Sequence, residues 1–542
     1  MTLTTDRAGT AGRTPTGKDV TDALAKLRAA LGDEHVLTDE QDRAWFAADF
    51  TDDDVPTPVA VARPGSAADV VEVVTTARAA GLAIVGRGGG MSYTLAHTPA
   101  RADTIVVDLR RLDRIVEINV DDRYVTVEPG VTWFQLREAL RGTGMRVPFH
   151  GTLSGLHATV GGGLSQNAVG LGRGFLVDYV LGLEVVLGDG RVLTTGSGAA
   201  GNAAPFWRNF GPDLSGLFLC DSGAFGLKTR ATLRLDPEPH GVALGCFGFD
   251  TARELIAAEV EIGRTDLASE CIGADSFMNT VMAEMPPPPK EEVRRIAKLV
   301  LAQSDSRPRA LRQLARAARP GGMRFLAKVP FSLVVVCDAD DQAAADRNLA
   351  RIRKICRRHG GKSLPTALAL GMRYAPFQPI HPLMVGKHGE AGMPSNLVFP
   401  LSRAQQAVNA LDAFMAEHVE EMERFGVYEV RNYLITGHFF GIEPILFWAD
   451  RLSTYRASWA SEEQRQEFAD AAPNPAAREC ALAVRAAMLA RFRELGAVHL
   501  QIGKVYPFKE ALAGGTTWEV LEQLKGIVDP DHLVNPGSLG LD

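Results

Sequence analysis

The chain has 542 residues, of which 46% are hydrophobic and 23% charged, which is ordinary for a globular protein of roughly two to four domains. Its formal net charge of −7 argues against nucleic acid as a partner, because a phosphate backbone needs a basic surface. No apolar run approaches the roughly twenty residues that span a bilayer. Residues 1–18 lack an apolar signal segment, so we expect a disordered lead-in and a cytoplasmic protein.

The first predicted elements are a helix over residues 19–31, a strand over 59–62 and a helix over 67–80. Ser66 is a suitable N-cap for the last of these helices, and Gly81 ends it. The six cysteines are scattered without a C-x-x-C pair, which is typical of reduced structural thiols. The sequence therefore predicts neither a disulfide framework nor a metal site built from cysteine.

A glycine-rich segment, residues 86–92, directly follows the short apolar run 82–85. Glycine tolerates positive φ and has no Cβ, so successive N–H groups of such a turn can point at one anion. A single turn of this kind is most often only a tight turn. A second glycine-rich segment, residues 160–167, is expected to form another such loop and raises the odds of a cofactor that contains a diphosphate.

Strands over residues 104–108, 115–119 and 124–127 and a helix over 132–141 separate the two glycine-rich segments and predict an α+β domain. A Rossmann fingerprint would need a third glycine opening a long helix. Met91 occupies the place of that glycine, and Pro99 interrupts the segment that follows. The sequence therefore disfavours a Rossmann domain.

The ordered motifs resemble the FAD-binding domain of the vanillyl-alcohol oxidase and p-cresol methylhydroxylase family of FAD-linked oxidases. The resemblance covers about Val59 to Pro239 and the end of the chain, and it rests on these segments: 63–64, 86–92, 127–131, 160–167, 182–190, 222–226 and 528–537. It implies an FAD-binding domain of two α+β subdomains beneath an α+β substrate cap. The domains expected are 1–18 (disordered), 19–239 (FAD-binding), 240–497 (cap) and 498–542 (returning to the FAD-binding domain).

The resemblance also implies which residues hold FAD. Residues 87–92 would cradle the pyrophosphate, residues 159–165 would line the flavin side, and Gly226 with its neighbours would approach the ribityl or adenosine end. The candidate cofactor-binding residues are Arg87, Gly88, Gly89, Gly90, Met91, Ser92, Pro129, Gly130, His157, Thr159, Gly162, Gly163, Ser165, Gly223, Gly226 and Asn535.

Two departures from the family pattern concern attachment of the flavin. Many relatives carry a histidine bonded to the flavin where Met91 stands, and doubly linked relatives carry a cysteine where His157 stands. Methionine and histidine supply neither linkage, so we expect non-covalent FAD. Spacing alone leaves His438 and Tyr433 as alternative attachment points. His157 is either a flavin or substrate neighbour or an ordinary polar residue beside a glycine turn.

Strands over 242–249 and 332–337 and helices over 252–262, 290–301 and 342–358 predict the cap, with the prolines of residues 285–289 starting one helix. Six arginines lie in residues 307–324. Their ordinary interpretation is a solvated helix face. The functional alternative is contact with an anionic membrane surface, where a quinone accepts electrons.

Candidate catalytic residues lie in the cap. Arg373, in a proline-rich context, is suited to bind a carboxylate bidentately, or is a surface arginine. Alternation predicts that Arg431 and Tyr433 share one face of a strand, which lines either a polar cavity or a solvent-facing sheet. His438 is the leading candidate for the general base.

Residues 498–506 precede the returning segment, and Lys504 and Tyr506 are candidate flavin or substrate contacts. The paired-histidine metal motif of related 2-hydroxy-acid dehydrogenases is missing, as is their glutamate–histidine–glycine motif. We therefore predict no metal.

The resemblance implies an FAD-dependent oxidoreductase that transfers a hydride from a hydroxylated small organic molecule, such as a 2-hydroxy acid, to flavin N5. Alternatives are oxidation of a 4-hydroxybenzylic compound, a flavin enzyme without net oxidation, and a non-catalytic binding protein. Oxygen, a quinone or a redox protein would accept the electrons, and a homodimer is one candidate assembly.

Overall fold

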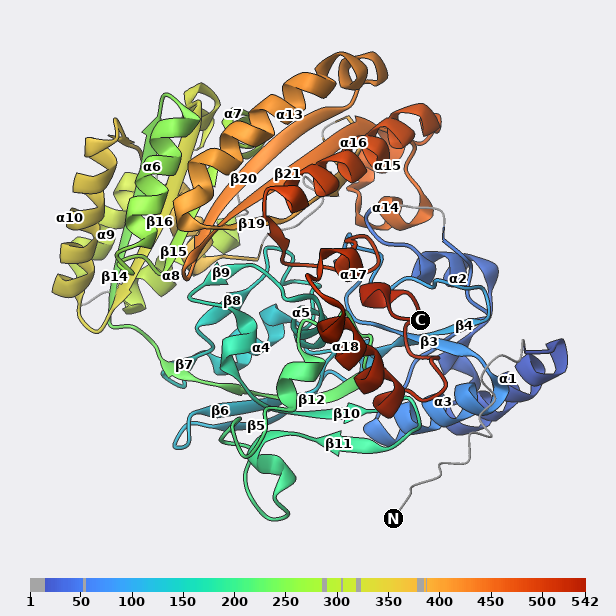
Figure 1. Cartoon of the computed structure of the whole chain (residues 1–542). Coiled ribbons are helices and arrows are strands. Elements are labelled where there is room, and N and C mark those ends of the chain that lie inside the picture. The colour runs from blue at the N-terminus through green and yellow to red at the C-terminus, as the bar shows by residue number, and fades with distance from the viewer. Residues whose placement is uncertain are drawn as a thin grey trace.

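A computed structural model describes residues 15–51, 55–284, 290–303, 306–317, 323–377, 385–386 and 388–542. Strands of the N-terminal half form a four-stranded sheet, a five-stranded sheet and two two-stranded sheets, and a larger sheet follows (Figure 1). We call residues 15–240 together with 500–542 the glycine-rich module, and residues 241–499 the cap. The expected disordered lead-in at residues 1–14 and the prolines of residues 285–289 lie outside the described residues.

The first sheet of the glycine-rich module has four strands in the order β1-β2-β4-β3, of which β2, β4 and β3 are parallel. Its strands are β1 (Val36–Leu37), β2 (Ala60–Ala62), β3 (Ala83–Arg87) and β4 (Thr104–Asp108), and its helices include α1 (Gly17–Leu31), α2 (Glu40–Ala47) and α3 (Ala67–Ala80). The predicted bounds of α3 are confirmed, with Ser66 capping it and Gly81 in the left-handed region. Helix α1 begins two residues earlier than predicted, because Thr16 and Asp19 form a capping box.

The second sheet is antiparallel, in the order β11-β10-β12-β6-β5. It comprises β5 (Ile115–Asn119), β6 (Tyr124–Val127), β10 (Val180–Val186), β11 (Val192–Thr194) and β12 (Leu227–Arg234). Helix α4 (Trp133–Leu140) and helix α5 (Val160–Gln166) pack into its core. The second glycine-rich segment is thus a helix rather than the predicted loop. Its glycines allow close packing, since a Cβ on Gly161 would lie 2.5 Å from Cβ of Pro129.

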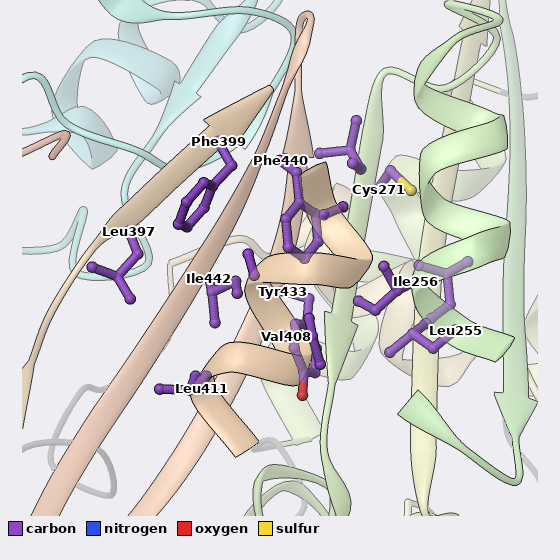
Figure 2. Close-up of a cluster of buried hydrophobic side chains, with 14 of the residues drawn as sticks. Leu255, Ile256, Cys271, Leu397, Phe399, Val408, Leu411, Tyr433, Phe440 and Ile442 are labelled. Atoms are coloured by element: carbon purple, nitrogen blue, oxygen red, sulfur yellow. The ribbon is translucent and has the colours of Figure 1, made fainter. Parts of the chain in front are cut away.

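The cap is built on a nine-stranded sheet in the order β17-β14-β16-β15-β20-β21-β19-β22, with β18 also paired to β21. Its strands are β14 (Gly241–Phe249), β15 (Glu270–Ala274), β16 (Phe331–Ala339), β17 (Lys362–Ser363), β18 (Glu390–Pro394), β19 (Leu397–Pro400), β20 (Tyr428–Thr436), β21 (Phe439–Ala449) and β22 (Val498–His499). The helices that cover one face are α6 (Ala252–Gly263), α10 (Gln342–Arg358), α13 (Ala404–Phe425) and α16 (Pro475–Glu494). Figure 2 shows side chains of this core, with Tyr433 of β20 beside Val408 and Leu411 of α13.

The opposite face of β14 and β16 packs against a smaller core. That core is formed with α8 (Lys290–Gln303), α9 (Arg307–Ala317) and α11 (Ala367–Tyr374). Helix α9 holds part of the arginine-rich segment, and residues 318–322 of that segment lie outside the described residues. Within the described part, Arg309 pairs with Asp346 of α10.

The chain leaves the cap through β22 and returns to the glycine-rich module (Figure 1). Helix α17 (Phe508–Ala511) and helix α18 (Gly515–Val528) pack there, and Asn535 N–H donates to the carbonyl of Ile84 in β3. All six cysteines are free. Among the helices of the described residues, none is long and apolar enough to cross a membrane.

Candidate functional site

The first glycine-rich segment touches the residues that lead into the second. A Cβ on Gly89 would overlap the carbonyl oxygen of His157, and one on Gly88 would overlap the hydroxyl of Thr159. Gly90 has φ +76°, which other residues rarely adopt. Glycine at these positions is therefore required by the close approach and by the backbone turn.

The turn after β3 presents unused donors. The N–H groups of residues 89–92 donate no hydrogen bond to any residue within the described ranges. Consecutive unpaired amides around a glycine of positive φ form a concave anion-binding site. The turn thus fits a diphosphate, and its donors come from the backbone rather than from a cluster of basic side chains.

Arg87 supports this turn instead of facing outward. Its side chain is 1% exposed, and its Nη1 donates to the carbonyls of Phe46 (3.1 Å) and Ala48 (2.7 Å). The guanidinium lies 5.2 Å from the ring centroid of Tyr455, whose hydroxyl donates to the Gly90 carbonyl at 2.6 Å. Burial lowers the pKa of Arg87.

The other predicted cofactor residues gather around the two segments. Asn535 Nδ2 donates to the carbonyls of Ala96 and Ser222, both at 2.8 Å, and so joins the C-terminal segment to the loop before Gly223. Ser165 accepts from Lys228 at 2.8 Å. The remaining members line the same region: Pro129 accepts from Gly161 N–H, Thr159 caps α5 ahead of Gly162 and Gly163, and Gly226 approaches Val186 in β10.

Met91 and His157 lie beside an aromatic cluster. Met91 packs against a small core of Phe50 and Tyr455. The His157 ring lies edge-on to Trp459, 4.8 Å between centroids, and burial lowers its pKa. His157 is therefore neutral at physiological pH.

A second group of polar side chains, which the sequence analysis did not select, bridges the module and the cap. Tyr93 OH donates to Glu443 Oε1 at 3.2 Å and accepts from Asn396 Nδ2 at 2.9 Å. Asn432 Nδ2 donates to Glu443 Oε2 at 3.0 Å. Asn432 lies directly opposite Glu443 in the β20–β21 pairing. We call Tyr93, Asn396, Asn432 and Glu443 the polar row.

Glu443 is half-buried, and this partial burial distinguishes it from an ordinary surface carboxylate. The burial raises the pKa of Glu443, although the hydrogen bonds from Asn432 and Tyr93 oppose that effect. Burial also raises the pKa of Tyr93 well above its usual value, so its hydroxyl stays protonated. A carboxylate with a raised pKa that already accepts two hydrogen bonds is suited to take a proton.

The sequence held one signal for this group. Glu443 is the lone charged residue in the apolar strand Phe439–Ala449, and a charge in such a strand calls for a partner. Tyr93 follows the glycine-rich turn directly. Their contact was not predictable, because the two residues are 350 positions apart.

The predicted catalytic residues do not join the polar row. Tyr433 is 1% exposed in the core of Figure 2, on the helix-covered face of the sheet. Arg431 pairs with Glu429 at 2.5 Å and with Asp412 of α13. The face expected to line a polar cavity is thus packed against helices, and Asn432 on the opposite face meets Glu443.

His438 and Arg373 also lie outside the polar row. His438 is exposed in the turn between β20 and β21, beside Phe439, which stacks on Phe175 of the module. Arg373 is 2% exposed, with Asp338 at 3.4 Å and Glu238 at 3.8 Å, so it is not a surface arginine. Lys504 donates to the carbonyl of Thr98 and to Asn535. Within the described ranges, no group of three His, Cys, Asp or Glu side chains is placed to hold a metal ion.

Comparison with known proteins agrees with this geometry. A family model described as an FAD binding domain matches residues 58–196. The 1′-carboxy-chondrochloren decarboxylase of Chondromyces crocatus is 36% identical over 226 residues, which cover 40% of this chain and 41% of that protein. The D-2-hydroxyglutarate dehydrogenase of Xanthomonas citri is 30% identical over 241 residues, which cover 43% of this chain and 49% of that protein. The chain thus spans about half or less of the length of these curated relatives.

Solved structures match nearly the whole chain. The 4-ethylphenol oxidase of Gulosibacter chungangensis has a TM-score of 0.75 at 19% identity, covering 98% of this chain and 99% of that one. The p-cresol methylhydroxylase has a TM-score of 0.74 at 17% identity, covering 97% and 98%. The chain therefore carries an FAD-binding domain and has the fold of the vanillyl-alcohol oxidase and p-cresol methylhydroxylase family.

Proposed function

We propose that the protein is an FAD-dependent oxidoreductase that oxidises a hydroxylated small organic molecule at the polar row. The observation that carries this proposal is the position of Glu443. A carboxylate with a raised pKa reaches from the cap to Tyr93, two residues beyond Met91 in the turn whose free amides suit a diphosphate. The proposed general base, Glu443, and the proposed cofactor site are thus adjacent in space.

When bound, FAD supplies the acceptor for a hydride. The residues of this chain supply the proton chemistry. Glu443 accepts the proton of the substrate hydroxyl at its carboxylate, while Asn432 fixes one carboxylate oxygen. Tyr93, held by Asn396, donates to the other oxygen and orients the substrate hydroxyl toward it.

The surroundings favour a neutral aromatic alcohol or phenol over a 2-hydroxy acid. Phe50, Tyr455 and Trp459 pack next to Tyr93, and the charged member of the polar row is an acid. Arg87, Arg373 and Arg431 already face carbonyls or carboxylates, so none of them is poised to pair with a substrate carboxylate here. The 2-hydroxy acid remains the second candidate, favoured by the D-2-hydroxyglutarate dehydrogenase relative.

We further propose that FAD is held without a covalent bond, since Met91 and His157 stand where linked relatives carry histidine and cysteine. Acid precipitation of purified protein tests this directly. Flavin is expected in the supernatant, and colour retained in the pellet would contradict the proposal. The electron acceptor (oxygen, a quinone or a redox protein), contact of residues 307–324 with a membrane, and a homodimer stay predictions.

Anaerobic bleaching of the bound flavin tests the function. A panel of 4-hydroxybenzylic compounds, simple benzylic alcohols and 2-hydroxy acids is mixed with oxidised enzyme, and absorbance of the flavin is followed. We expect fast bleaching by the first class. Bleaching by hydroxy acids alone would reverse the substrate assignment, and protein that neither contains nor takes up FAD would refute the oxidoreductase proposal.

A further inference from the structure

A loop of the glycine-rich module presents large apolar side chains to solvent. It lies between β11 and β12 and comprises residues 196–214, which we call the aromatic loop. Its side chains of Phe206, Trp207, Phe210 and Leu214 are between 49% and 55% exposed. In Figure 1 the green segment that follows β11 projects below the second sheet, on the side of the module away from the cap. The aromatic loop is therefore separate from the polar row.

Hydrogen bonds within the module hold the backbone of this loop in place. Ser197 N–H donates to the carbonyl of Trp207 at 2.7 Å, and Trp207 N–H donates to Ser197 Oγ at 3.0 Å. Arg208 donates to the carbonyl of Val177 at 2.7 Å and pairs with Asp213 at the same distance. The exposed side chains thus belong to a fixed surface rather than to a frayed segment. A contiguous apolar patch of this kind marks an interaction site.

The charge and the size of the patch indicate a protein as its partner. Arg208 and Asp213 are the charged residues of the segment 192–214, and they pair with each other. The patch is therefore neutral and has no attraction for a polyanion or for an anionic surface. Three half-exposed aromatic side chains and one leucine leave roughly 300–400 Å² of apolar surface uncovered. That is nearly half of the approximately 800 Å² that each partner of a standard protein interface buries.

An open edge of the second sheet lies beside the aromatic loop. Strand β11 ends the sheet, and no described strand pairs with its other side. The backbone N–H and carbonyl groups of Val192 and Thr194 make no hydrogen bond to described residues outside the pairing of β10 with β11. Alternate residues of an edge strand direct these groups away from the sheet. A Cβ on Gly198 would lie 3.3 Å from Pro205 and 3.6 Å from Thr194, so the loop borders this edge.

The two features together favour a second copy of this chain as the occupant. A lipid bilayer accepts apolar side chains but cannot satisfy the hydrogen bonds of a strand edge. An antiparallel strand satisfies them, and a two-fold axis makes each β11 strand the partner of the other. The same axis places one neutral patch against the other without repulsion between like charges.

We propose that the protein forms a two-fold symmetric dimer through the aromatic loop and the edge of β11. The β11 strands of the two copies pair antiparallel and join the two five-stranded sheets. Phe206, Trp207 and Phe210 of each copy are buried against the other. This proposal is independent of the oxidoreductase proposal, because neither the polar row nor the glycine-rich turn takes part.

Sedimentation equilibrium of the holoenzyme over a dilution series tests the dimer. We expect a dissociation constant of about 1 µM or lower for wild type. The double variant Trp207→Ser, Phe210→Ser loses the apolar centre, so its dissociation constant should be about 100-fold higher or more. Val116→Ser is the matched control, since Val116 is an exposed apolar residue of β5 at the opposite edge of the same sheet. It should associate as wild type does.

A second variant tests the strand edge without changing an aromatic side chain. Thr194→Pro removes an N–H that is directed outward and keeps the pairing of β11 with β10, so it should also weaken the dimer. Circular dichroism of each variant should match that of wild type, because the replaced side chains lie outside the core.

Three results would overturn the proposal. The first is wild type that stays monomeric at about 50 µM, well above the expected dissociation constant. The second is a dimer of unchanged affinity in the double variant or in Thr194→Pro. The third is a monomeric wild type that sediments with phosphatidylcholine vesicles while the double variant does not, since this would assign the aromatic loop to a membrane.

Discussion

The polar row and the charged cluster of Arg146, Glu238, Asp338 and Arg373 both join the glycine-rich module to the cap, yet they hold buried charge differently. In the polar row the one carboxylate accepts two hydrogen bonds, and the tyrosine that donates one of them is itself held by Asn396. In the cluster around Arg373, by contrast, Arg146 pairs with Asp338 at 2.7 Å, and Arg373 faces Asp338 at 3.4 Å and Glu238 at 3.8 Å. A hydrogen-bonded network around one acid is suited to orient a reacting group, whereas a cluster of opposite charges is suited to hold two parts of the chain together.

The largest effect is expected in the polar row. Glu443→Gln keeps the shape and hydrogen bonds of the side chain but cannot take a proton, so flavin reduction should slow by about 10²–10⁴-fold. Stopped-flow bleaching with the best substrate measures it. Glu390→Gln makes the same change at a buried cap glutamate that accepts from Tyr428, and should leave the rate unchanged. Equal rates in Glu443→Gln and wild type would contradict the assignment.

The pH dependence of flavin reduction tests the same role of Glu443. The pKa of Glu443 is raised by burial, and the carboxylate is the active form. The rate of flavin reduction should therefore fall as the pH drops through the raised pKa of Glu443. Glu443→Gln should not show this decrease.

A smaller effect is expected in the charged cluster around Arg373. Burial raises the pKa of Glu270, which lies near Arg373, to about 7. The folded protein thus favours neutral Glu270, so its contribution to stability is complete below pH 4.5 and is lost as pH rises through 7. From pH 4 to pH 8, the stability of Glu270→Gln should rise relative to wild type by up to about 3 kcal/mol.

Urea unfolding across this pH range measures the difference. Glu522 is an exposed glutamate paired with Lys509, so the free energy of unfolding of Glu522→Gln should change with pH as that of wild type does. If the free energy of unfolding of Glu270→Gln also changed with pH as that of wild type does, Glu270 would be solvated. The difference between the polar row and the region around Arg373 would then be smaller.

The smallest effect concerns Tyr93. Tyr93→Phe removes the hydroxyl that donates to Glu443 but leaves the acid in place, so flavin reduction should slow by about tenfold. Tyr428→Phe removes a hydroxyl with the same 3.2 Å bond to a cap glutamate, and should not slow reduction. An equal loss in both variants would show that the cap, rather than the polar row, has been disturbed.

Local chemistry let the sequence predict much of the fold. Helix α3 with its Ser66 cap, the strands β4, β5 and β6, and helix α10 have the predicted bounds, because caps, alternation and glycine stops act within a few residues. The second glycine-rich segment was predicted as a loop, since the packing of Gly161 against Pro129 that permits a helix is not visible in sequence.

For the site, the sequence by itself determined the glycine-rich turn and the residues that gather around it. The sequence also showed that side chains of β20 alternate between two faces, which places Arg431 and Tyr433 on one face and Asn432 on the other. Only the tertiary structure decided which face meets the module, because that depends on where α13 packs and on the register that sets Asn432 opposite Glu443. Burial, which raises the pKa of Glu443 and encloses Arg373, arises from the same long-range packing.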